Sequence, residues 1–161
     1  MKRFHKIMVG CDFSRYSKET LECAVALAEK LQADLIIANI INKKEIDTLL
    51  KVAEGQFDRN IEKYMEKTAQ EYESRVKADR TRQMEKLIEE IGCVHLPIKK
   101  VFKVGVPFQE LIRAIEDEGA DMLVMGQKGR SDLVDVLFGS TAEKVFRRCP
   151  VPLLSVRPQK R

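Results

Sequence analysis

The stretch that decides the fold is Asp121 to Val145, which reads DMLVMGQKGRSDLVDVLFGSTAEKV. It opens with the short apolar run Met122–Met125, which ends at a glycine, as is common for buried strands. A glycine-bearing loop follows. Ser140 and Glu143 then form the sequence pattern of a capping box. The stretch therefore predicts a strand, a loop and a helix that begins at Ser140.

This arrangement predicts an anion-binding site between Gly126 and Gly139. Glycine allows a ligand to approach the backbone closely. The first amides of a helix have no partner within the helix, and the helix dipole favours negative charge there. Lys128 and Arg130 add two cations, so we interpret the stretch as a phosphate-binding site. It matches neither the P-loop nor the dinucleotide-binding fingerprint, and Gly126-x-x-Gly129 taken alone is also typical of an ordinary turn.

The composition is that of a single globular domain, residues 1–161. The 161 residues are 44% hydrophobic and 34% charged, with a net charge of only +4. Such a mixed-sign surface argues against nucleic-acid binding. No apolar run is long enough to span a membrane, and the first residues lack the pattern of a signal peptide, so we expect a cytoplasmic protein. The four cysteines form no C-x-x-C pair, and we expect reduced thiols and no metal site.

The first forty residues predict a right-handed strand–helix–strand unit. The run Lys6–Cys11 is the expected first strand, and Ser17–Leu31 has the spacing of a helix that Ser17 could cap. The second strand, Leu35–Ile41, is apolar on both faces, which is typical of a parallel sheet covered by helices on both sides.

Asp12 lies where the first predicted strand ends. In open parallel sheets, ligands bind outside the carboxyl ends of the strands. A carboxylate there could accept hydrogen bonds from ribose hydroxyls or hold a metal. Asp12 could equally well cap the turn into the following helix, and both interpretations are open.

Residues 43–94 form a charged helical insert within the domain. Apolar residues at helical spacing predict a long amphipathic helix over Phe57–Ile91, with a polar or kinked middle at Lys77–Gln83. A short helix is favoured over Ile46–Val52. For the C-terminal half of the long helix we favour a crossover packed on the sheet. The N-terminal half is either a solvated extension or an arm for a partner.

The last third of the chain continues the alternation of strands and helices. Pro97–Val104 is a third strand whose lysines suit an edge position. Pro107–Glu118 has the pattern of a helix that ends at Gly119. A fifth strand, Val151–Val156, contains Pro152 and therefore also suits an edge.

Together these segments predict an α/β fold, an open five-stranded parallel sheet with helices on both faces. Asp121–Met125, in the stretch quoted at the start, is the fourth strand. A switch in strand order would open a crevice between the first and fourth strands. Asp12 and Gly126 would both border that crevice. The two candidate sites, identified separately, therefore converge on one pocket.

The chain resembles the universal stress protein family, and its ATP-binding branch in particular. The motif G-x2-G-x9-G-[ST] is present at Gly126, Gly129, Gly139 and Ser140, and VGCDFSRYS resembles the end of the family's first strand. Gln127 and Lys128 stand where small or ring-bearing residues are frequent, and Lys128 could strengthen or crowd phosphate binding. The resemblance implies an adenine nucleotide alpha hydrolase-like fold with strand order 3-2-1-4-5.

The resemblance also implies a binding site for ATP. Asp12 would contact the ribose, Ile40 and the Val104–Gly105 pair would line the adenine, and Mg²⁺ or Mn²⁺ would bridge phosphate oxygens. The residues expected to contact the nucleotide are Gly10, Asp12, Ile40, Val104, Gly105, Met125, Gly126, Gln127, Lys128, Gly129, Arg130, Ser131, Gly139, Ser140 and Thr141.

The expected function is a nucleotide-dependent regulatory or stress-response module. The family resemblance implies a homodimer through Val151–Val156, and the protein partner is unknown. The alternatives are a dimeric interaction module without nucleotide and a slow ATP hydrolase. Hydrolysis requires a positioned base, for which Asp12, Asp132 and Asp135 are candidates by location only.

Overall fold

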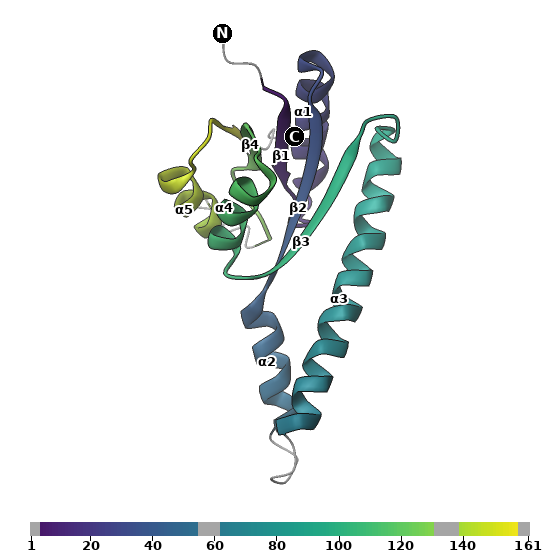
Figure 1. The fold of residues 1–161 in the computed structure, drawn as a ribbon, viewed down its shortest axis with the longest axis vertical. Helices are drawn as coiled ribbons and strands as arrows, with labels where there is room; N and C mark the ends of the chain where they lie inside the picture. Colours follow the sequence, from purple (N-terminus) through teal and green to yellow (C-terminus); the bar gives the residue numbers. More distant parts are fainter. Residues whose placement is uncertain (1–3, 55–61, 131–138, 158–161) are drawn as a thin grey trace.

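The computed structural model describes residues 4–54, 62–130 and 139–157. Five parallel strands form one sheet in the order β3-β2-β1-β4-β5, which confirms the predicted topology (Figure 1). The strands are β1 (Lys6–Gly10), β2 (Asp34–Asn42), β3 (Ile98–Gly105), β4 (Met122–Gly126) and β5 (Leu153–Val156). The helices are α1 (Ser17–Leu31), α2 (Lys43–Glu54), α3 (Glu62–Ile91), α4 (Pro107–Glu118) and α5 (Ser140–Arg148).

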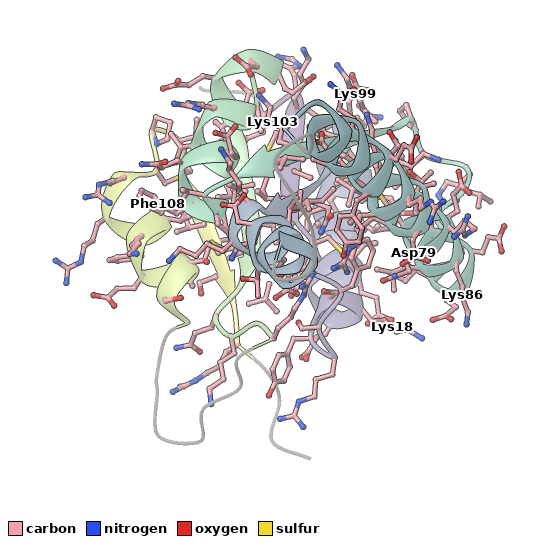
Figure 2. The ribbon with its side chains drawn as sticks, turned by 90° about the horizontal axis from the view of Figure 1, so that it is seen from below. Lys18, Asp79, Lys86, Lys99, Lys103 and Phe108 are labelled. Carbon is pink, nitrogen blue, oxygen red and sulfur yellow. The ribbon has the colours of Figure 1, made fainter. Side chains whose placement is uncertain are left out.

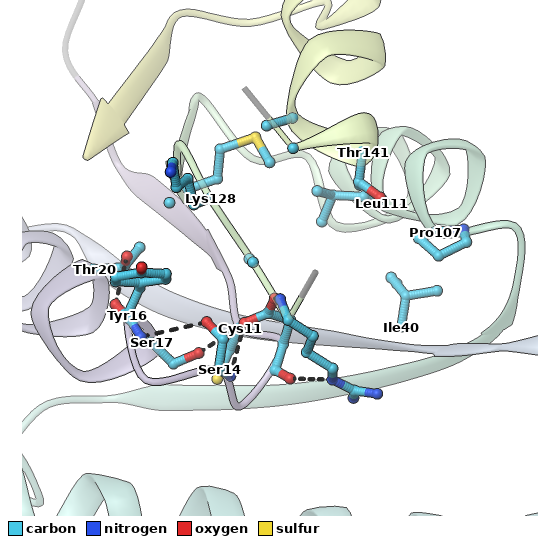
Figure 3. Close-up of a pocket in the computed structure, with 18 of the residues that line it drawn as sticks. Cys11, Ser14, Tyr16, Ser17, Thr20, Ile40, Pro107, Leu111, Lys128 and Thr141 are labelled. Carbon is cyan, nitrogen blue, oxygen red and sulfur yellow. Dashed lines mark hydrogen bonds between the residues drawn. The ribbon is translucent and has the colours of Figure 1, made fainter. Parts of the chain in front are cut away.

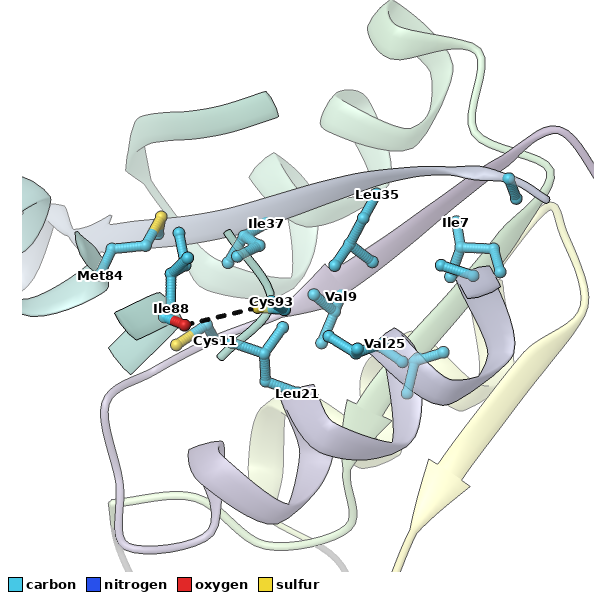
Figure 4. Close-up of a cluster of buried hydrophobic side chains, with 14 residues drawn as sticks. Ile7, Val9, Cys11, Leu21, Val25, Leu35, Ile37, Met84, Ile88 and Cys93 are labelled. Atoms are coloured by element: carbon cyan, nitrogen blue, oxygen red, sulfur yellow. Dashed lines mark hydrogen bonds between the residues drawn. The ribbon is translucent and has the colours of Figure 1, made fainter. Parts of the chain in front are cut away.

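Helices cover both faces of the sheet, as the apolar central strands predict. On one face, alternate residues of β1 and β2 pack with Leu21 of α1 and Met84 of α3 (Figure 4). On the other face, Met8 and Leu123 pack with Leu111 of α4 and Val145 of α5. Because both faces of the central strands are buried, these strands are apolar throughout.

The predicted element boundaries agree with the structure to within a few residues, but both predicted side-chain caps are wrong. Tyr16 is the N-cap of α1, and the Ser17 hydroxyl instead donates to Asp12 Oδ1 at 3.0 Å. Gly139 is the N-cap of α5, so Ser140 is already helical, and Glu143 pairs with Arg147 at 3.0 Å rather than closing a capping box. The helix still begins at Ser140, as predicted.

The insert forms a two-helix arm, α2 and α3, that extends beyond the end of the sheet (Figure 1). The predicted short helix is longer than expected and begins directly after β2. The long helix is continuous through Lys77–Gln83, while residues 57–61 lie outside the described part of the chain. Met84 and Ile88 are buried on the sheet, which supports a crossover role for the C-terminal half.

The edge position predicted for β3 is confirmed, and its lysines are paired on both faces of the sheet. Lys99 and Lys103 form ion pairs with Glu118 and Asp117 of α4, whereas Lys100 pairs with Glu85 of α3 at 2.7 Å. Strand β5 is the other edge. It begins at Leu153, two residues later than predicted, since Pro152 has no N–H to donate to the ladder. None of the helices in the described ranges is long and apolar enough to cross a membrane.

Candidate functional site

A cavity of about 280 Å³ opens at the carboxyl ends of β1 and β4, the position predicted for the ligand crevice (Figure 3). Residues at the end of β2 and at the starts of α4 and α5 complete its wall. The sheet order changes direction here, because β1 lies between β2 and β4. The cavity therefore occupies the topological switch point of the fold.

Most of the expected nucleotide-contacting residues line this cavity. They are Gly10, Asp12, Ile40, Met125, Gly126, Lys128, Gly129, Arg130, Gly139, Ser140 and Thr141. Ser131, like Asp132 and Asp135, lies outside the described residues.

Three of the expected residues do not line the cavity. Val104 and Gly105 end the edge strand β3, and the Glu110 side chain lies against Gly105, where a Cβ would be 2.5 Å from Glu110 Cγ. Gln127 is buried, and its backbone joins the loop to its neighbours: its N–H donates to Val156 O at 2.9 Å, and its carbonyl accepts from Gly139 N at 3.0 Å. Gln127 thus fixes the loop rather than facing the cavity.

The glycines of the loop are required by close packing. A Cβ on Gly129 would lie 2.4 Å from Asp12 Oδ2, and a Cβ on Gly126 would lie 3.0 Å from Lys128 O. Among the described residues, positive φ occurs elsewhere, at Phe13, Gln32, Gly92, Gly105 and Gly119. Close approach, and not a left-handed backbone, is therefore the reason for glycine at both positions.

Asp12 both caps the turn after β1 and borders the cavity. Its Oδ1 accepts hydrogen bonds from Ser14 N at 2.9 Å and from the Ser17 hydroxyl at 3.0 Å. Its Oδ2 accepts from Arg130 N at 3.2 Å, across the crevice. The two interpretations left open by the sequence are therefore compatible, because the two carboxylate oxygens face different groups.

Helix α5 points its N-terminus at the same cavity. Gly139, Ser140, Thr141 and Ala142 all line it. The first amides of an α-helix have no acceptor within the helix, and the dipole places partial positive charge there. The first bond of this helix runs from Glu143 N to Gly139 O at 2.9 Å. Gly129 and the first turn of α5 thus border one space and supply backbone donors that suit an oxyanion, whereas the amides of Gln127, Arg130 and Gly139 already donate within the chain.

Arg130 spans the crevice instead of projecting from the loop as a free cation. Its Nε donates to Asp12 O at 2.8 Å, and its Nη1 donates to Glu45 Oε1 at 3.0 Å. Since Glu45 is in the first turn of α2, the guanidinium crosses the end of β1 and connects the β4 loop to the arm. Arg130 lines the cavity, but its partners were not foreseen.

Sequence reasoning missed several lining residues. Those at the end of β1 and the start of α1 were visible as part of VGCDFSRYS, whereas Glu45 lies in the insert, where no motif pointed to it. The missed residues are Cys11, Ser14, Tyr16, Ser17, Thr20, Ala38, Asn42, Glu45, Pro107, Leu111 and Ala142. In the described ranges, no group of three or more His, Cys, Asp or Glu side chains is placed to hold a metal ion.

Three cysteine thiols, two of them buried, predict that the free energy of unfolding falls in alkali. Desolvation by burial raises the pKa of Cys11, and it also raises the pKa of Cys93 and Cys149. The unfolded chain ionises these thiols near their ordinary pKa of about 9, where the folded chain keeps them protonated. The stabilisation is therefore complete below that pH and is lost as the pH rises through the folded-state pKa.

Urea unfolding of the wild type and Cys11→Ala checks this, from neutral pH to about one unit above the ordinary thiol pKa. The free energy of unfolding should fall more steeply with pH in the wild type. Equal slopes would mean that Cys11 ionises as easily in the folded chain as in the unfolded one.

Comparisons with known proteins agree with the fold. The model of the universal stress protein family matches residues 3–157. The chain is 28% identical over 160 residues to universal stress protein MJ0577 of Methanocaldococcus jannaschii, covering 96% of this chain and 95% of that one. It is 26% identical over 159 residues to universal stress protein YxiE of Bacillus subtilis, covering 96% and 99%.

Solved structures show the same fold. A structure of MJ0577 superimposes with a TM-score of 0.80 at 24% identity, covering 99% of this chain and all of that one. A universal stress protein crystallised in complex with cAMP superimposes with a TM-score of 0.62 at 23% identity, covering 98% and 100%. Since the family model matches nearly the whole length, the chain belongs to the universal stress protein family.

Proposed function

We propose that the cavity binds ATP and that the protein acts as a nucleotide-dependent regulatory module of the stress response. One observation carries the proposal: the Gly126–Gly129 loop and the start of α5 face the cavity that Asp12 borders. Backbone donors from two segments would hold a polyphosphate, and the free lone pairs of Asp12 Oδ2 are acceptors for ribose hydroxyls. A volume of about 280 Å³ is close to the lower end of small-molecule sites, about 300 Å³.

The side chains of the cavity divide into an apolar part and a glycine-lined part. Ile40, Pro107 and Leu111 supply apolar surface at the end of β2 and the start of α4 (Figure 3). That surface suits an aromatic base, while the glycine-lined part suits charge. A Mg²⁺ or Mn²⁺ ion would be held mainly by phosphate oxygens, because Asp12 already accepts three hydrogen bonds.

The cAMP complex of a structural neighbour supports nucleotide binding by this fold in general. For this chain we propose the linear triphosphate, because the backbone donors come from two separate segments. A polyphosphate can reach both, whereas a cyclic monophosphate is shorter. Competition between ATP and cAMP for the site would measure that preference directly.

The test is calorimetric titration of the purified protein with ATP and Mg²⁺, together with mass spectrometry of the protein as purified. One nucleotide bound per chain is expected. An empty cavity with no measurable affinity would instead favour the alternative, an interaction module that works without nucleotide.

The geometry favours binding over turnover. The described carboxylates at the cavity, Asp12 and Glu45, are both engaged by Arg130 and neighbouring groups. Asp12 accepts three hydrogen bonds and is therefore not free to activate a water, even where a nucleotide displaces Glu45 from Arg130. Phosphate release no faster than in buffer with Mg²⁺ is expected, and sustained turnover would support the slow hydrolase instead.

The Arg130–Glu45 pair supplies a route from the cavity to the arm. A bound polyphosphate would compete with Glu45 for the guanidinium, and α2 begins at that contact. Nucleotide binding would thereby change how the first turn of α2 is held, and with it the surface offered to a partner.

Replacing Glu45 by glutamine should increase ATP affinity severalfold at low salt. The substitution removes a negative charge that competes with the nucleotide for Arg130. The side chains of Arg130 and Glu45 are 40% and 47% exposed, so the loss of their ion pair should lower the free energy of unfolding by less than about 1 kcal/mol. Calorimetry at two salt concentrations measures the effect, which should shrink at high salt. Glu85→Gln, which breaks an ion pair of α3 remote from the cavity, is the matched control. Equal affinities for Glu45→Gln and the wild type would contradict the competition.

We further propose that the protein is a cytoplasmic homodimer paired through the Val151–Val156 segment. Strand β5 is an edge of the sheet, and Leu154 is an exposed large apolar side chain on it. An edge strand offers unpaired backbone groups to a second copy. Light scattering of the wild type should give twice the chain mass, and Leu154→Lys should lower the measured mass. A monomeric wild type would exclude an interface through Val151–Val156.

A further inference from the structure

A second cavity, of about 350 Å³, lies at the base of the arm between α2, α3 and the end of β2. Its apolar floor comes from Ile41, Ile46 and Val76. It is separate from the nucleotide cavity, although Glu45 lines both. Figure 2 views the molecule from the arm side, with Asp79 and Lys86 labelled on α3.

The face of α3 that lines this second cavity is unexpectedly polar. Its members recur at helical spacing, from Tyr72 through Val76 and Asp79 to Gln83, with Arg75 and Arg80 beside them. A helix face that packs on another helix is normally apolar. This face instead includes part of the polar stretch that the sequence places in the middle of the long helix. Packing between the two helices does not account for it.

Arg80 is the central cation of that face. One side of its guanidinium lies over the Phe13 ring, 5.4 Å from the centroid. Burial lowers the pKa of Arg80 and the neighbouring Arg130 lowers it further, while the Glu45 and Asp79 carboxylates act in the opposite direction. Within the described part of the chain, no carboxylate lies within ion-pair distance of Arg80 or Arg75. The guanidinium of Arg80 is half-buried, and its N–H groups are donors that are more stable when they are bonded to an acceptor.

The nearby carboxylates accept hydrogen bonds from residues other than Arg80 and Arg75. Asp79 accepts hydrogen bonds from Gln83 Nε2 at 2.6 Å and from Arg82 at 3.4 Å. Glu45 accepts from Arg130 at 3.0 Å. Of the four charged residues that line this cavity, Arg75 and Arg80 are thus the two without an ion-pair partner in the described part of the chain, and both lie next to an apolar floor.

We propose that this second cavity binds a small molecule that carries a phosphate group on an apolar body. Arg80 and Arg75 would hold the phosphate, because guanidinium groups bind oxyanions through paired, charge-assisted hydrogen bonds. Ile46 and Val76 would contact the apolar body. The proposal does not depend on ATP binding, since the residues that carry it, apart from the shared Glu45, are outside the nucleotide cavity.

The test is a titration of the full chain with phenyl phosphate, followed by amide NMR shifts. Shifts are expected around residues 72–83 of α3, with phenol and inorganic phosphate binding more weakly. Arg80→Gln should weaken the affinity read from these amides by about tenfold, because it removes a charge-assisted contact. Lys86→Gln is the matched control, since Lys86 is exposed on the same helix, pairs with Glu90 outside the cavity and should bind like the wild type.

Two results would overturn the proposal. One is a set of shifts confined to the Gly126–Gly129 loop, which would place the phosphate in the nucleotide cavity alone. The other is an affinity at α3 that Arg80→Gln and Arg75→Gln both leave unchanged. Arg75 is exposed, so its variant stays informative even if Arg80→Gln disturbs packing on Phe13.

Discussion

Valine in place of Gly129 is expected to weaken ATP binding by at least about 100-fold, because two effects act together. The new Cβ would lie 2.4 Å from Asp12 Oδ2, so either the loop or the carboxylate must move. Asp12 cannot move freely, since Ser14 N and the Ser17 hydroxyl hold its other oxygen. The loop would therefore be displaced from the start of α5, and the added methyl groups would occupy the cavity. Calorimetric titration with ATP measures the loss.

Gly139→Ala is the matched comparison for this variant. A Cβ on Gly139 would meet Gln127 O at 3.7 Å and Gly129 N at 3.8 Å, which are ordinary contacts, and its φ of −65° suits alanine. We expect a stability within about 0.5 kcal/mol of the wild type and a smaller loss of ATP affinity, because the methyl group would sit beside the Gly129 amide. Wild-type affinity in Gly129→Val, with a normal thermal unfolding curve, would refute the phosphate site.

The largest loss of stability is expected for Met84→Ala. Met84 is fully buried where α3 crosses the sheet, among Leu21, Ile37 and Ile88 (Figure 4). Truncation of such a side chain removes apolar contacts and leaves a cavity, at a cost of about 2–5 kcal/mol. Urea denaturation followed by circular dichroism measures it.

Lys86→Ala, two residues along the same helix and exposed, is the control and should change stability by less than about 0.5 kcal/mol. A cost below about 1 kcal/mol for Met84→Ala would instead mean that this half of α3 is only loosely attached to the sheet.

The sequence was sufficient to predict the sheet and the place of the cavity. Short apolar runs that end at glycine or aspartate, such as Met122–Met125, mark strands buried on both faces. The alternation with helices then permits few topologies, because crossovers are right-handed. The carboxyl ends of β1 and β4 had to be neighbours, so Asp12 and Gly126 were expected on one crevice, and the close packing of the neighbouring Gly129 against Asp12 agrees.

The details that depend on side-chain geometry could not be predicted in the same way. The capping-box pattern at Ser140 failed because the chain is already helical there, one residue after an extended Gly139. Glu45 belongs to a charged segment in which many acids are equivalent by composition. Only the three-dimensional path of α2, which starts directly at the end of β2, brings its carboxylate to Arg130.

The two edges of the sheet differ in a way that limits assembly. On β3, lysines engage acids from both covering layers, so an incoming strand would meet charge along that side. The opposite edge, β5, lacks such a fringe between Leu153 and Val156. A fibre that grows by strand addition needs two edge strands on every copy that are open to pairing. A molecule with one such edge can pair only once, with the same edge of a second copy. In the homodimer that we propose, this asymmetry would favour a closed pair over amyloid-like stacking.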